Sequence, residues 1–107
     1  MTNKILTLLG FASKAGKLSY GFDASLTSLK KHKSNLILIP YDISKKSAKE
    51  INFFAEKVNV KCLILEGLNI ENVSDAIGRK CGIISVNDPS FAKGCINAIS
   101  EGENAND

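Results

Sequence analysis

The sequence predicts an α/β fold, a three-layer α/β/α sandwich built around a mostly parallel sheet of about four strands. Amphipathic helical stretches alternate with short apolar stretches along the whole chain. The apolar run at residues 36–39 has no polar alternation, which is typical of a strand covered on both faces. Predicted helices of about ten residues separate the strands, and such helices form the crossover connections that parallel strands require.

Local patterns predict the individual elements. Ile5, Leu8, Leu9 and Ala12 form the apolar stripe of a first helix, and Gly16 stands where a left-handed C-cap belongs. The other predicted elements are an extended segment at 18–20, a helix ending in the basic run 30–33, a strand at 36–39, a helix that Ser44 caps, a strand at 60–65, a helix around 70–77, a strand at 83–86 and a final helix that begins at Asp88 or Ser90.

The length of 107 residues fits a single domain. We expect one domain over residues 1–100 and a flexible polar tail over residues 101–107, because the last residues are small, polar or acidic. No apolar run approaches the roughly 18 residues of a membrane-spanning helix. The first residues are also too short and too periodic a stretch for a signal peptide, so we expect a cytoplasmic protein.

The composition gives little support to metal or enzyme chemistry. Cys62, Cys81 and Cys95 form no C-x-x-C pair and stand among apolar residues, so we expect buried free thiols. The single histidine, His32, makes a metal site unexpected. Asp42 follows a strand and precedes a helix, which fits a helix cap. Because the sequence holds no P-loop, G-x-G-x-x-G or G-x-S-x-G motif, we predict neither an enzyme nor a required cofactor.

Charge is distributed unevenly along the chain. The net charge is +3, but residues 1–61 carry a net charge of +7 and residues 62–107 one of −4. A basic half fits an anionic partner such as a nucleic acid, if folding gathers its lysines on one face. Lysines that only solvate the outer faces of helices would give the same totals.

The segment at residues 18–25 is the strongest candidate for a binding loop. Gly21 can turn the backbone sharply, and the helix after it begins with amide groups that can meet a phosphate. Four lysines stand near this loop in the sequence, and an RNA with splayed bases suits such a surface. An ordinary strand-to-helix turn, capped by Asp23, fits the same residues.

Motifs spread over residues 4–99 carry a resemblance to a known family. They are LGFASKAGKL at 9–18, Gly21, the strand at 36–39 with Asp42 after it, AIGRK at 76–80 before the strand at 83–86, and Asp88 with Phe91 and Ala92. In this order and spacing they resemble the ribosomal protein family that binds kink-turn RNA, the archaeal L7Ae type, and in particular its small bacterial YlxQ-type members. The resemblance implies an α/β/α sandwich and a non-enzymatic role in binding ribosomal or other structured RNA.

The RNA-reading loop of that family, of the form G-x-N-E-x-x-K, falls on residues 21–27. Gly21 matches the pattern, whereas Asp23, Ala24 and Thr27 replace asparagine, glutamate and lysine. Aspartate accepts hydrogen bonds but repels phosphate, and the missing lysine removes a cation, so recognition of kink-turns stays open. Tyr41 replaces an acidic residue of the family, and the resemblance places an apolar contact loop at residues 68–70.

The predicted function is the non-catalytic binding of structured RNA, kink-turn-like or ribosomal. The alternative is a protein-interaction or regulatory module that keeps the fold and has lost kink-turn recognition; a small-molecule or enzymatic role comes third. Lysines gathered around Gly21 would favour RNA, and an exposed apolar patch there would favour a protein partner. The residues expected to contact RNA are Lys14, Lys17, Gly21, Asp23, Ala24, Thr27, Lys30, Lys31, Tyr41, Asn69 and Ile70.

Overall fold

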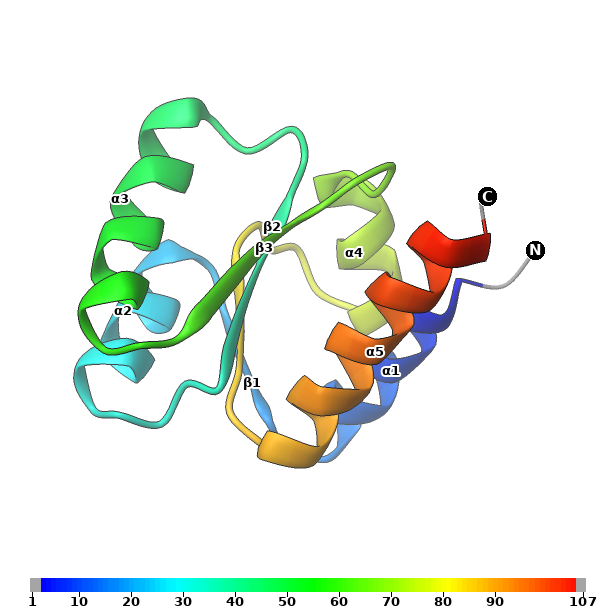
Figure 1. Cartoon of the computed structure of the whole chain (residues 1–107), viewed down its shortest axis with the longest axis horizontal. Coiled ribbons are helices and arrows are strands. Elements are labelled where there is room, and N and C mark those ends of the chain that lie inside the picture. The colour runs from blue at the N-terminus through cyan, green and yellow to red at the C-terminus, as the bar shows by residue number, and fades with distance from the viewer. Residues whose placement is uncertain (1–2, 106–107) are drawn as a thin grey trace.

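The computed structural model describes the backbone of residues 3–105, in which helices and strands alternate as the sequence predicts (Figure 1). The elements are α1 (Lys4–Lys14), β1 (Leu18–Tyr20), α2 (Phe22–Lys30), β2 (Leu36–Pro40), α3 (Lys45–Lys57), β3 (Lys61–Leu65), α4 (Ile70–Ile77), β4 (Ile84–Val86) and α5 (Pro89–Ala105). Among the described residues, no helix is both long and apolar enough to cross a membrane.

The four strands form one sheet in the order β1-β4-β2-β3. β2 pairs with β3 in parallel, and β4 pairs antiparallel with both of its neighbours. The sheet is therefore mixed, and the prediction of a mostly parallel sheet is wrong in this detail. β1, β2 and β3 all point the same way, so only the last strand is reversed.

The reversal of β4 follows from where α4 lies. A crossover helix would cover the sheet and return the chain to the edge where β3 begins. Instead α4 packs mainly against α1, so closely that a Cβ atom on Gly10 would stand 3.3 Å from the carbonyl oxygen of Ala76. The helix ends at Gly78 in the left-handed conformation, and the chain enters β4 at the edge where β2 and β3 end.

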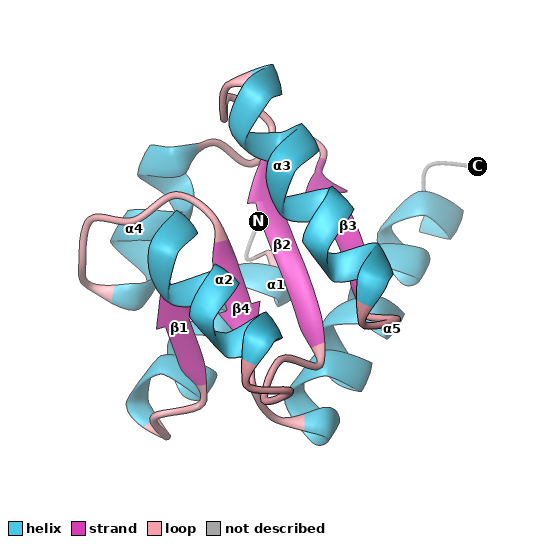
Figure 2. Cartoon of the chain, turned by 90° about the vertical axis from the view of Figure 1, so that its left-hand side faces the viewer, coloured by secondary structure: helices cyan, strands magenta, loops and turns pink. Residues whose placement is uncertain are grey.

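Helices cover both faces of the sheet, which confirms the three-layer architecture. Figure 2 shows α2 and α3 in front of the sheet and α1, α4 and α5 behind it. The side chains of β2 alternate between two cores: Leu36 and Leu38 pack with the α1, α4 and α5 side, and Ile37 and Ile39 with the α2 and α3 side. All five residues of β2 are buried, as expected of a strand covered on both faces.

A buried polar cluster joins α2 to the reversed strand. The Ser85 hydroxyl oxygen lies 2.7 Å from the Ser34 hydroxyl oxygen and 2.7 Å from Oδ1 of Asn87. The side-chain amide of Asn87 donates to the Ser19 hydroxyl at 2.8 Å, and the Ser28 hydroxyl donates to Oδ1 of Asn87 at 2.6 Å. These bonds satisfy polar groups that would otherwise be costly to bury, and they fix the end of β4 against β1 and α2.

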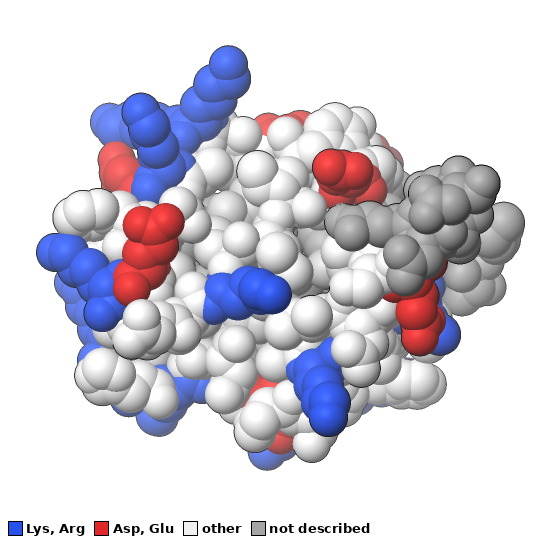
Figure 3. Space-filling model, viewed as in Figure 1, with Lys and Arg blue, Asp and Glu red and all other residues white. Residues whose placement is uncertain are grey.

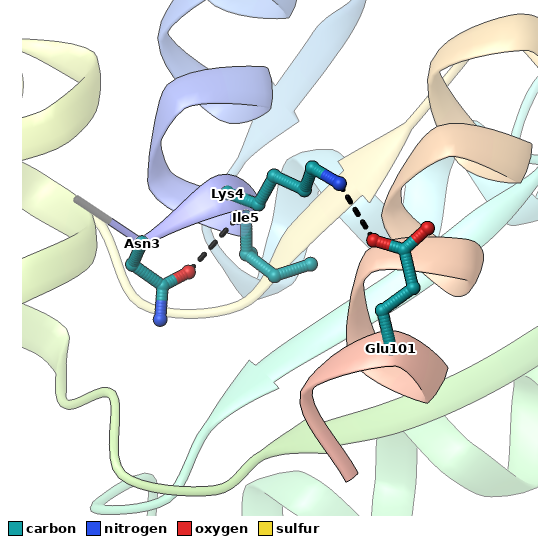
Figure 4. Close-up of polar contacts among 4 residues, drawn as sticks. All are labelled: Asn3, Lys4, Ile5 and Glu101. Carbon is teal, nitrogen blue, oxygen red and sulfur yellow. Dashed lines mark hydrogen bonds and ion pairs between the residues drawn. The ribbon is translucent and has the colours of Figure 1, made fainter. Parts of the chain in front are cut away.

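The two ends of the described chain meet at one corner of the molecule. Asn3 caps α1 by accepting from the Ile5 amide at 2.9 Å, and Lys4 pairs with Glu101 of α5 at 2.6 Å (Figure 4). Both side chains of this pair are exposed, so it contributes less than about 1 kcal/mol. α5 extends through residues 101–105 of the predicted tail, and residues 106–107 lie outside the described residues. The domain boundary and the flexibility of the tail stay predictions.

Candidate nucleic-acid interface

The turn between β1 and α2 is held by one backbone bond. The Gly21 amide donates to the Ile83 carbonyl at 2.7 Å, and Gly21 has φ of 91°, a conformation that favours glycine. Because glycine is the N-cap of α2, no side chain among the described residues caps this helix. The first-turn amides of α2 therefore have no capping side chain, which leaves them available to an anion.

The predicted reading-loop residues lie on the first two turns of α2. Asp23, Ala24 and Thr27 are all exposed. Ala24 and Thr27 are three residues apart, and Asp23 and Thr27 are four apart, so these side chains are neighbours on the outer surface of the helix. Substitutions at these positions can change binding without disturbing the core.

The segment between α4 and β4 adds two basic side chains that the sequence analysis did not include among the contacts. The Ile83 bond to Gly21 and the pairing of Tyr20 with Ile84 bring this segment beside the start of α2. Arg79 and Lys80 are both exposed, and the Arg79 guanidinium carbon lies 4.2 Å from the centre of the Tyr20 ring. A basic pair directly after the helix-ending Gly78 was the sequence signal for this loop.

Tyr41, Asn69 and Ile70 lie at the same edge of the sheet, beyond the ends of β2 and β3. Tyr41 is 55% exposed, and its amide donates to the Leu68 carbonyl at 3.1 Å. The Asp42 carboxylate accepts from the Ile70 amide at 2.9 Å, and Asn69 and Asn72 cap each other's backbone amides. Asp42 and Asn69 thus hold the start of α4 in place, and the exposed ring of Tyr41 is open to a ligand.

The four predicted lysines do not gather around Gly21. Lys14 ends α1 and Lys17 precedes β1, whereas Gly21 follows β1. Lys30 and Lys31 stand at the far end of α2. The lengths of β1 and α2 separate both lysine pairs from Gly21 by about 13 Å. The lysines therefore form a second basic region at the opposite edge of the sheet, where β1 and β2 begin.

The cysteines are free and their thiols are shielded, which agrees with the sequence-based expectation for Cys81 and Cys95. Cys62 is only half-buried on β3. Burial raises the pKa of Cys95 to about 11, and burial together with the Glu56 carboxylate raises the pKa of Cys62 to about 11. Burial also raises the pKa of Cys81, partly offset by its hydrogen bond to Ser74 and by Arg79. Within the described chain, no three side chains of the metal-ligating types come together.

Comparison with known proteins identifies the family. Residues 3–96 match the sequence profile of the ribosomal protein L7Ae/L30e/S12e/Gadd45 family. The chain belongs to this family. The match covers most of the chain and includes both the Gly21 turn and the segment between α4 and β4, so the resemblance seen in the sequence is confirmed.

Three similar proteins match most of this chain, one by sequence and two by structure. The RNA-binding protein YlxQ of Enterococcus faecium is 24% identical over 90 residues, which are 84% of this chain and 85% of that protein. A protein of unknown function from Bacillus halodurans superposes with a TM-score of 0.87 at 21% identity, over 92% of this chain and 99% of that one. The Giardia lamblia 15.5kD RNA binding protein superposes with a TM-score of 0.76 at 12% identity, over 94% and 85%. These structures confirm the fold.

Proposed function

We propose that this L7Ae-family chain is a non-catalytic, cytoplasmic RNA-binding protein that binds structured RNA at the edge of the sheet around Gly21. The observation that carries the proposal is the bond between the Gly21 amide and the Ile83 carbonyl. Because Ile83 ends the segment that carries Arg79 and Lys80, this bond joins that basic segment to the uncapped start of α2, and we expect amide donors and cations to meet the same ligand there. The name of the YlxQ relative, an RNA-binding protein, agrees with this function.

Three kinds of contact follow from the arrangement. The start of α2 and Arg79 offer hydrogen-bond donors with fixed directions, which suit a particular RNA shape. Tyr41, exposed at the same edge, offers a ring on which an unpaired base can stack. The lysines at the opposite edge offer phosphate contacts that carry no sequence information, and only an RNA long enough to reach both edges meets them.

Kink-turn or ribosomal RNA is the proposed class of ligand. The exposed residues that replace the family pattern on α2 limit the expected preference for kink-turn RNA. Asp23 places a negative charge beside the open amides, and Ala24 and Thr27 offer neither a carboxylate nor a cation. We expect structured RNA to bind, and we expect the preference for a kink-turn over a plain duplex to be weak.

The test is fluorescence anisotropy with a labelled kink-turn RNA, a duplex of equal length and a single strand, at low salt. Wild-type protein should bind at least one structured RNA. A double variant, Arg79→Gln with Lys80→Gln, should bind about five- to tenfold more weakly. Lys93→Gln, an exposed change on α5, is the matched control and should bind as wild type does. If no structured RNA binds, or if the double variant binds as well as wild type, the proposal fails and the protein-interaction alternative takes its place.

A further inference from the structure

β3 is an edge strand whose second side is free. It pairs with β2 on one side, and no described strand lies on the other. In Figure 1, β3 crosses in front of the sheet between α3 and α5, with no element covering it. Such an edge presents backbone amides and carbonyls that can pair with an added strand.

A groove runs between this strand and α3. Its volume is about 480 Å³, and its lining residues are Ile39, Lys45, Ala48, Lys49, Asn52, Cys62 and Ile64. The apolar groups on β3 are incompletely covered: Ile64 is 59% exposed, and Cys62 is half-buried. Figure 3 shows a largely uncharged middle to this face, with several basic side chains and some acidic ones on the side where α3 lies. An exposed isoleucine on an open strand edge is a liability unless a partner covers it.

The charges around the groove indicate what kind of partner fits. Lys45 and Lys49 line it, and no acidic residue does. One acidic group, Glu56, is close enough to act on the Cys62 thiol, but it is not among the residues that line the groove. Pairing of two β3 strands from two copies would bring the lysines of both α3 helices toward each other, which is unfavourable. The groove therefore fits an acidic segment of a different protein better than a second copy of this chain.

We propose that an extended, acidic and aliphatic segment of a partner protein adds to the free edge of β3 and fills the groove between α3 and β3. Main-chain hydrogen bonds to β3 hold the segment in register. Alternate side chains enter the groove against Ala48, Cys62 and Ile64, and acidic side chains of the segment meet Lys45 and Lys49. This surface is separate from the Gly21 turn, because β4 and β2 lie between β1 and β3.

The test is selection from a random heptapeptide library displayed on phage, followed by anisotropy with the enriched peptides. Enriched sequences should alternate aliphatic residues and should carry aspartate or glutamate. Ile64→Lys should weaken peptide binding about tenfold or more, and Lys49→Glu should weaken it several-fold. The matched control is Phe11→Lys, because Phe11 on α1 is 58% exposed and lies outside the groove; it should leave peptide binding unchanged.

Four outcomes of the peptide and sedimentation measurements would overturn the proposal. They are no enrichment, enrichment of basic peptides, peptide binding that Ile64→Lys leaves intact, and a dimer in sedimentation that Ile64→Lys abolishes. Retained RNA binding by Ile64→Lys, measured in the same preparation, shows that the variant is folded. A loss of RNA binding in Ile64→Lys and Lys49→Glu, without peptide binding, would assign the groove to RNA and contradict the proposal.

Discussion

The guanidinium carbon of Arg79 lies 4.2 Å from the centre of the Tyr20 ring, and this contact joins the loop before β4 to the end of β1. The Tyr20 hydroxyl lies 2.7 Å from the Ser13 hydroxyl, so the ring is anchored at its other end by α1. A stacked guanidinium keeps its N–H groups in a fixed plane at the ring surface. Arg79 is thus positioned at the Gly21 edge before any ligand arrives.

Two substitutions of Arg79 should distinguish what its positive charge contributes to RNA affinity from what its planar guanidinium group contributes. Arg79→Lys keeps the charge but loses the planar group, so RNA affinity should fall about threefold with an unchanged salt dependence. Arg79→Gln also removes the charge, so the slope of log affinity against log salt should become shallower by about 0.7–0.9. Anisotropy titrations over a range of salt concentrations measure both effects. Equal affinity of both variants and wild type would show that Arg79 does not touch RNA.

The salt dependence of wild-type binding should report the number of phosphate contacts. We expect about three to five contacts, each adding roughly 0.7 to 0.9 to the slope. Because Lys14 and Lys17 lie at the edge opposite Gly21, replacing both with glutamine should lower the slope for a long RNA. The same change should leave a short RNA that covers only the Gly21 edge unaffected. A loss on both RNAs would contradict the division of the surface into two edges.

The sequence predicted the layers of this fold but not the direction of its last strand. The apolar run in β2 indicates burial on both faces, because periodicity reports which faces of an element are covered. The reversal of β4 depends on the packing of α4 against α1, at Gly10 and Ala76, which are distant in the sequence. No local pattern encodes such a contact, so the prediction used the commoner crossover connection.

Part of the candidate site could likewise be predicted from the sequence, and part could not. Gly21 was predictable, since a glycine between a strand and a helix marks a turn with an open helix start. The distance of Lys17 and Lys30 from Gly21 could not be predicted, because nearness in sequence does not show which end of an element a side chain occupies. Arg79 is 58 positions from Gly21 in the sequence and reaches it only through the pairing of β1 with β4.

The thiols should react slowly in the folded protein. With the pKa of Cys62 and Cys95 raised to about 11, only about one thiol in a thousand is ionised near pH 8. The unfolded chain loses these protons near pH 9, so both groups should make the folded protein less stable as the pH rises from 9 to 11. Reaction with a thiol reagent, with and without denaturant, measures the protection. Rapid native modification of two or more cysteines would contradict it and reopen a redox role.

Removing the side chain of Asn87 should destabilise the fold. The substitution Asn87→Ala removes the side-chain partner of the half-buried Ser19 hydroxyl and leaves the buried Ser28 hydroxyl only its 3.3 Å contact with the Ser85 hydroxyl, which should cost about 1–3 kcal/mol of unfolding free energy. Urea denaturation measures the change. Asn97→Ala, an exposed change on α5, is the matched control and should stay within about 0.5 kcal/mol of wild type. Equal stability of both variants would show that the cluster is not a structural support.

Restoring the family pattern on α2 should create a preference for the kink-turn. The triple variant Asp23→Asn, Ala24→Glu and Thr27→Lys regains groups that pair with base edges, each worth about 1–3 kcal/mol by analogy with DNA readout. Its affinity for a kink-turn should rise more than its affinity for a duplex of equal charge, at one salt concentration. An added lysine alone raises both affinities alike. An equal gain in affinity for both RNAs would mean that residues 21–27 are not a kink-turn-binding loop that has lost its contact residues.

The central claim is that structured RNA binds at the edge formed by the Gly21 turn and the segment between α4 and β4. The most direct measurement is the change in backbone amide chemical shifts when a structured RNA is added to isotopically labelled protein. The largest changes should fall on the amides of residues 21–27 and 79–83, with smaller changes near Tyr41 and at the lysine edge. Changes confined to α3 and β3, or no changes in the presence of excess structured RNA, would contradict the claim.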